Sequence, residues 1–212
     1  MKTEDLIALL AEDTRPTGTR TFGPLLVGAA LAGAAISAVV LAAWLGFRPL
    51  MPAMHSPPFW MKATYTALLA AAALLAGVRL ARPGGRIGAA LLLGAVTVAA
   101  LAMMAGHETM AAAPGEVPKL WLGDSWNVCP FRILALAAPV FAVVIWMMRR
   151  TAPTRPMLAG AAAGLLAGAV GATVYGLYCE ETTAAFVVVW YTLGMAACSA
   201  VGAAIGSRLL RW

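Results

Sequence analysis

The chain has few charged residues, and this scarcity excludes an ordinary soluble domain. Of its 212 residues only 11% are charged and 62% are hydrophobic, and the mean hydropathy is +0.84. Soluble domains carry about a quarter charged residues. The polar residues stand in short blocks between long apolar runs. The composition therefore predicts an all-α, polytopic membrane protein.

The sequence also lacks the motifs of common catalytic and ligand-binding sites. It contains no nucleophile constellation, phosphate-binding glycine loop, HExxH or CxxC motif. No ionisable residue stands in the middle of an apolar run, which argues against a transporter or pump. No basic patch is interleaved with aromatic residues, as nucleic-acid binding would require. We therefore expect neither an enzyme nor a protein that contacts nucleic acid directly, and no resident cofactor.

Six apolar runs are each close to the ~20 residues that cross a bilayer as a helix. The run that comes first is too long for the apolar part of a cleaved signal peptide, so we expect it to be a retained helix. A segment over 1–22 precedes the transmembrane domain, which fills 23–212. The predicted spans are 23–47, 59–81, 86–106, 131–148, 157–178 and 184–206.

The basic residues predict how the chain lies in the membrane. With the N-terminus inside, eleven of the 15 basic residues fall on inner segments. The other four, on outer segments, are Arg48, Lys62, Lys119 and Arg132. Because cytoplasmic loops carry the excess of Lys and Arg, both termini are expected in the cytoplasm of a bacterium, with the protein in the inner membrane. The inner residues are Lys2, Arg15, Arg20, Arg79, Arg82, Arg86, Arg149, Arg150, Arg155, Arg208 and Arg211.

A short amphipathic helix is predicted over 3–13, before Pro16 ends it. It could rest on the bilayer or dock on a soluble protein. Its acidic residues, Glu4, Asp5, Glu12 and Asp13, outnumber Lys2, and an anionic inner leaflet repels acids, so we favour protein docking. The candidate docking side chains form its apolar stripe: Leu6, Ile7, Leu9 and Leu10.

Two of the three cysteines are expected at the same outer end of a helical hairpin. Cys129 lies 25 residues before the inner turn at Thr154, and Cys179 lies 25 residues after it. Facing an oxidising periplasm, the two thiols could form a disulfide or bind a soft metal, although they could also lie unpaired on separate faces. Cys198 stands among small residues spaced four apart, which predicts a helix-packing role. Those residues are Gly194, Gly202 and Gly206, and the preceding span has Gly160, Gly164, Gly168, Ala172 and Gly176.

Acidic residues and a histidine are expected on the same outer face as the two cysteines, and together they could form a metal site. A set of Cys129, Cys179, His107 and Glu180 could hold a divalent heavy-metal ion transiently, with Glu108 and Glu181 nearby. The alternative is that these acids are solvated loop residues.

Three stretches of the chain resemble a known family. They are the opening Thr3-Glu4-Asp5-Leu6-Ile7-Ala8-Leu9-Leu10-Ala11 with Arg15-Pro16 after it, the stretch Trp126-Asn127-Val128-Cys129-Pro130, and Tyr175-Gly176-Leu177-Tyr178-Cys179-Glu180 followed by Trp190-Tyr191. In these stretches, in length and in span count, the chain resembles the NrsF-type bacterial inner-membrane anti-sigma factors.

The resemblance implies a function that composition and spacing do not reveal. Such proteins hold an extracytoplasmic-function sigma factor at the membrane and release it under stress, and two outward cysteines are needed for the response to metal or oxidative signals. These cysteines match Cys129 and Cys179. Many relatives have a histidine before the second cysteine, where this chain has Tyr178, which weakens imidazole-assisted metal binding. The alternatives are a small-molecule transporter or permease subunit and a membrane thiol oxidoreductase.

Overall fold

The computed structural model describes residues 22–82 and 84–211, and these ranges contain helices and no β-strand. The predicted docking residues Leu6, Ile7, Leu9 and Leu10 lie outside the described residues. Six helices are long and apolar enough to cross a membrane, which confirms the predicted all-α class and the number of spans. They are α2 (Phe22–Trp44), α4 (Pro57–Leu80), α5 (Gly88–Ala111), α7 (Cys129–Met148), α8 (Pro156–Tyr175) and the last span, which ends in α10 (Thr192–Leu209).

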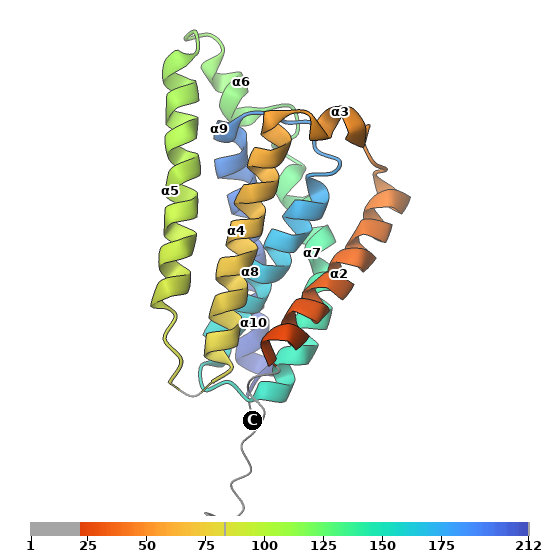
Figure 1. Ribbon diagram of the computed structural model, residues 1–212, viewed down its shortest axis with the longest axis vertical. Helices are drawn as coiled ribbons and strands as arrows, with labels where there is room; N and C mark the ends of the chain where they lie inside the picture. The colour runs from red at the N-terminus through yellow and green to blue at the C-terminus, as the bar shows by residue number, and fades with distance from the viewer. Residues whose placement is uncertain (1–21, 83, 212) are drawn as a thin grey trace, which may run out of the picture.

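Several short elements lie between or within these spans. The last span begins with α9 (Ala184–Phe186) and a π-helical turn, η2 (Val187–Tyr191), which run on into α10. A 3-10 turn, η1 (Arg149–Thr151), follows α7. Helices α3 (Leu50–Met54), α6 (Val117–Leu122) and α9 gather at one end of the bundle, which we call the cysteine end, and α10 ends at the other (Figure 1).

One predicted boundary is wrong in a way that matters for the site. The loop expected to begin at His107 begins after Ala111, because helix α5 continues that far. Residues 107–111 contain no helix breaker, and the chain reaches no proline until Pro114. His107 and Glu108 therefore belong to the last turns of a helix and are not loop residues.

Helix α8 is the buried centre of the bundle. Two thirds of its span (67%) is buried, compared with 22% for α5. It contacts α10, α7, α4 and α2, whereas α5 lies at the edge beside α4 (Figure 1). Alanine and glycine supply most of its length, so its neighbours can approach its backbone on several sides.

The closest approach in the bundle is between α8 and α10. A Cβ atom added at Gly160 would meet the carbonyl oxygen of Gly202, and one added at Gly164 would meet that of Cys198. A Cβ at Gly168 would lie 2.9 Å from the Cβ of Cys198. The predicted small-residue packing of these two spans, with Cys198 as a packing residue, is confirmed.

Hydrogen bonds made by buried side chains join further helices. The hydroxyl of Ser37 in α2 donates to the carbonyl oxygen of Leu136 in α7, at 2.6 Å. The hydroxyls of Tyr65 in α4 and Thr192 in α10 also lie 2.6 Å apart. In lipid such bonds contribute about 0.6 kcal/mol each, so they set the helix register more than they hold the bundle together.

Replacing Gly160 by alanine should separate α8 from α10. The new methyl group would clash with backbone atoms of Gly202 and Gly206, which cannot rotate away, so we expect a loss of about 1–3 kcal/mol in unfolding free energy. The measurement is unfolding of the purified protein in detergent. Gly28→Ala on α2 is the matched control, because a Cβ there meets nothing within 4 Å. Equal stability of the two variants would contradict the packing argument.

Candidate functional site

Cys129 and Cys179 lie together at the cysteine end. Cys129 is the first residue of α7, and Cys179 follows the end of α8. Both are free thiols, with exposed fractions of 0% and 2%. They belong to one hydrophobic cluster and are close enough to interact electrostatically. The hairpin of α7 and α8 thus brings the two thiols to one buried site.

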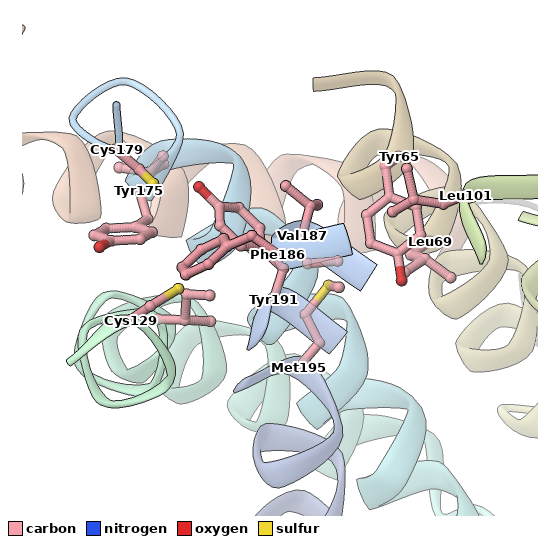
Figure 2. Packing of buried hydrophobic residues seen from close by; sticks show 14 of the residues in the cluster. Tyr65, Leu69, Leu101, Cys129, Tyr175, Cys179, Phe186, Val187, Tyr191 and Met195 are labelled. Atoms are coloured by element: carbon pink, nitrogen blue, oxygen red, sulfur yellow. The ribbon is translucent and has the colours of Figure 1, made fainter. Parts of the chain in front are cut away.

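Two tyrosine rings share this site with the thiols. Tyr175 in the last turn of α8 and Tyr191 in η2 are fully buried, with their ring centroids 5.8 Å apart. Figure 2 shows both rings with Cys129 and Cys179. Among the described residues, neither tyrosine hydroxyl has a hydrogen-bond partner. Buried hydroxyls normally find a partner, so these two are unusual in being unpaired in the cluster that contains the thiols.

A buried lysine holds the loop that carries Cys179. The Lys62 side chain in α4 is only 2% exposed. Its Nζ donates to the carbonyl oxygens of Cys179, at 2.8 Å, and Glu181, at 2.7 Å. Hydrogen bonds from a charged donor contribute about 1.5–3 kcal/mol. Lys62 therefore ties the loop after α8 to α4.

The carboxylate of Glu181 connects the same loop to the segment after α6. Its Oε1 accepts from the backbone N–H groups of Asp124 (2.8 Å) and Ser125 (3.0 Å) and from the Ser125 hydroxyl (2.9 Å). Gly123 permits this approach, since its φ is +58° and a Cβ there would lie 2.6 Å from the Glu181 carboxylate. Position 123 accordingly requires glycine.

The carboxylate of Glu108 also accepts hydrogen bonds from backbone N–H groups, at the start of the last span. Its Oε2 accepts from the backbone N–H groups of Ala184, at 2.8 Å, and Ala185, at 3.2 Å. These N–H groups open α9, where no earlier carbonyl is available to them. The Thr183 side chain caps the same turn by accepting from the N–H of Phe186 at 3.3 Å. A carboxylate from α5 thereby fixes where the helix carrying Tyr191 begins.

A cleft of about 940 Å³ opens onto this site. Cys179 and Tyr175 line it, and Cys129 is not among the lining residues. A reagent from the surrounding medium would therefore reach Cys179 before Cys129.

The structure does not assemble the four-residue metal set. Within the described ranges, no three histidine, cysteine, aspartate or glutamate side chains come close enough to hold a metal ion. His107 and Glu180 are exposed, while Glu108 and Glu181 are engaged by backbone N–H groups. Of the predicted set, only Cys129 and Cys179 come together.

Lys62 is the site residue to which the sequence analysis gave no role in the site, and Glu181 was placed near a metal set and not between two loops. A lysine at the sixth position of an apolar helix is a signal that could have identified Lys62, because such a charge needs a partner in the membrane. Its partners are 117 and 119 residues away in sequence, however, and the sequence does not name them.

Replacing Lys62 by methionine should expose Cys179. The variant leaves the carbonyl oxygens of Cys179 and Glu181 unpaired. For each 1.4 kcal/mol by which this loss destabilises the closed loop, the loop should open about tenfold more often. The readout is the rate of maleimide labelling in a chain whose only cysteine is Cys179. Lys119→Met, which removes an exposed lysine at the same end, is the control and should label at the parent rate. An unchanged rate in Lys62→Met would mean that the lysine does not hold the loop.

Known proteins resemble the chain over its whole length. The family described as NrsF, Negative regulator of sigma F, matches residues 10–212. An anti-sigma-F factor NrsF of Caulobacter vibrioides (strain NA1000 / CB15N) is 44% identical over 215 residues, which cover 100% of both chains. A probable anti-sigma-F factor NrsF of Azospira oryzae (strain ATCC BAA-33 / DSM 13638 / PS) is 41% identical over 213 residues, again with 100% of both covered. No solved structure matches. The chain therefore belongs to the NrsF family of negative regulators of sigma F.

Proposed function

We propose that this protein is a membrane-bound anti-sigma factor. It holds an extracytoplasmic-function sigma factor at the bacterial inner membrane and releases it when Cys129 and Cys179 react with a metal ion or an oxidant. The observation that carries the proposal is full-length similarity, at 44% and 41% identity, to two proteins named as anti-sigma-F factors. The six apolar helices supply the membrane anchor.

The cysteine end faces outward in this proposal, and both termini face the cytoplasm. Its support is the distribution of basic residues, because Arg79, Arg82, Arg149 and Arg150 all stand at the opposite end. The sigma factor then meets the segment before α2. The apolar stripe of Leu6, Ile7, Leu9 and Leu10 docks on it and blocks its binding to RNA polymerase.

The signal acts on Cys179 first, because Cys179 lines the cleft. A two-electron oxidant would join its sulfur to that of Cys129, and both thiol protons would be lost while the oxidant takes the electrons. A soft divalent metal ion would instead bind both sulfurs as thiolates and displace the same two protons. Either reaction shortens the distance between the start of α7 and the loop after α8.

The reaction at the thiols displaces α8, and the displacement is passed to α10 and so to the cytoplasmic side. Cys179 follows α8 directly, and the glycine contacts join the α8 backbone to that of α10, which ends at Leu209 on the far side. Moving the sigma factor from almost fully bound to almost fully free requires about 5.5 kcal/mol of discrimination between the two states. A covalent or metal–sulfur bond can supply energies of this size.

Serine at both positions 129 and 179 should abolish release while leaving sigma-factor binding intact. The double variant keeps the size of both side chains but can neither form a disulfide nor bind a soft metal. The measurement is transcription from a sigma-dependent promoter with and without metal or peroxide. Cys198→Ser is the control, because Cys198 packs against Gly168 away from this site. Normal release in the double variant would refute the sensing role.

Removing residues 1–13 should free the sigma factor. Loss of a docking stripe of four apolar side chains should weaken binding by about 2–4 kcal/mol, roughly 30- to 1,000-fold. The measurement is co-purification of the sigma factor with the full chain and with the truncated chain. Replacing Glu4 and Asp5 by glutamine and asparagine keeps the stripe and serves as the control. Undiminished co-purification of the truncated chain would place the docking surface elsewhere.

A further inference from the structure

An arginine at the cysteine end has two buried nitrogens for which the described protein offers no acceptor. They are Nε and Nη2 of Arg48, four residues beyond the end of α2. These two nitrogens form one edge of the guanidinium group, with their N–H bonds nearly parallel. That edge is the one that grips two oxygens of the same anion. The unpaired atoms are therefore not scattered but form a single two-pronged donor.

The surroundings hold this donor in place. The Arg48 backbone N–H donates to the carbonyl oxygen of Leu177 at 3.4 Å, and its Cζ lies 5.3 Å from the centre of the Phe59 ring. A guanidinium group cannot lose its charge in a protein, so it cannot escape the cost of burial by deprotonation. Leaving a buried charged donor unpaired costs more than the 1–3 kcal/mol of a neutral group. A bound acceptor would remove that cost.

Arg48 lines the same cleft that reaches Cys179. Further donors in its wall are Arg132 and the unpartnered hydroxyl of Tyr175, whereas Lys119 lines the cleft with an exposed side chain. Carboxylates also line the cleft, but Glu181 is already engaged by three donors. The remaining acids are Glu116, Asp124 and Glu180, all exposed. The buried unpaired groups of the residues that line the cleft are thus donors, and the acids that Glu181 leaves are exposed.

We propose that the cleft binds a small tetrahedral oxyanion, such as inorganic phosphate or the phosphate of a lipid headgroup. The Nε and Nη2 edge of Arg48 holds two of its oxygens, and the Tyr175 hydroxyl and Arg132 are available to the others. A tetrahedral anion suits this arrangement because it presents acceptors in several directions at once. A metal cation does not suit the Arg48 side of the cleft, since the buried groups there are donors and Lys62 lies close to Arg48.

The position of the anion has a consequence for the thiols. Tyr175 lines the cleft and also packs in the cluster that contains Cys129 and Cys179. An anion bound beside Tyr175 would stand between the opening and Cys179. Occupancy should therefore slow any reagent that approaches this thiol. This inference concerns the cleft alone and does not depend on the sigma factor.

The test uses the full chain in detergent, with Cys179 as its only cysteine. Maleimide labelling is followed as sodium phosphate replaces sodium chloride at constant ionic strength. We expect phosphate to protect Cys179 saturably and to raise the unfolding temperature beyond the effect of chloride. Protection equal to that in chloride would overturn the proposal without the need for any variant.

Two variants then distinguish bidentate hydrogen bonding by Arg48 from a general effect of positive charge in the cleft. Arg48→Lys keeps the charge but has no parallel N–H pair, and we expect it to weaken phosphate protection about tenfold or more. Lys119→Gln removes one charge from the exposed part of the same cleft and should leave protection nearly unchanged. Equal protection in Arg48→Lys and the parent, or a larger loss in Lys119→Gln, would overturn the assignment.

Native mass spectrometry distinguishes the two sources of the phosphate group. A phospholipid that stays bound to the parent chain but not to Arg48→Lys would identify a headgroup. Phosphate protection with no retained lipid would identify a free anion. If Glu180→Gln lowers stability as much as Arg48→Lys and phosphate protects neither chain, then Glu180 pairs with the arginine and the proposal fails.

Discussion

The contact between the backbones of α8 and α10 is the constraint on which the rest of the structure depends. Glycines at positions 160, 164 and 202 let the two helices approach so closely that no side chain fits between them. Because lipid gives helices no hydrophobic reason to associate, such packing must come from close backbone contact. The contact sets the position of α8 in the centre, and it brings Tyr175 at the end of α8 beside Tyr191 before α10. The site at the cysteine end is a product of this arrangement.

Charged groups at that end act as structural links. Lys62 joins α4 to the loop after α8, Glu181 joins that loop to the segment after α6, and Glu108 joins α5 to the start of α9. Glu108 satisfies N–H groups that the start of a helix leaves unpaired, whereas Lys62 and Glu181 satisfy backbone groups of loops. The loop that carries Cys179 is thus tied to α4 and to the segment after α6. A displacement of Cys179 would therefore disturb the hydrogen bonds that Lys62 makes to this loop.

The sequence was sufficient for the parts of the fold that depend on one helix or on two neighbours. Hydropathy predicted the six spans, small residues four apart predicted the contact of α8 with α10, and equal distances from Thr154 predicted that Cys129 and Cys179 would share one end. It failed where a side chain finds its partner far along the chain. Among the described residues the metal set does not come together, because the side chains of His107 and Glu180 are exposed and no spacing rule reveals this. Arg48 looked like an ordinary loop residue because only the folded chain buries its guanidinium edge.

The central claim is that Cys129 and Cys179 form one reactive unit at one end of the membrane domain. The most direct measurement is mild oxidation of the purified full chain with diamide, followed by digestion and mass spectrometry of the disulfide-linked peptides. The account predicts an intramolecular bridge between Cys129 and Cys179, with Cys198 left as a free thiol. A bridge that includes Cys198, or bridges only between separate molecules, would contradict it.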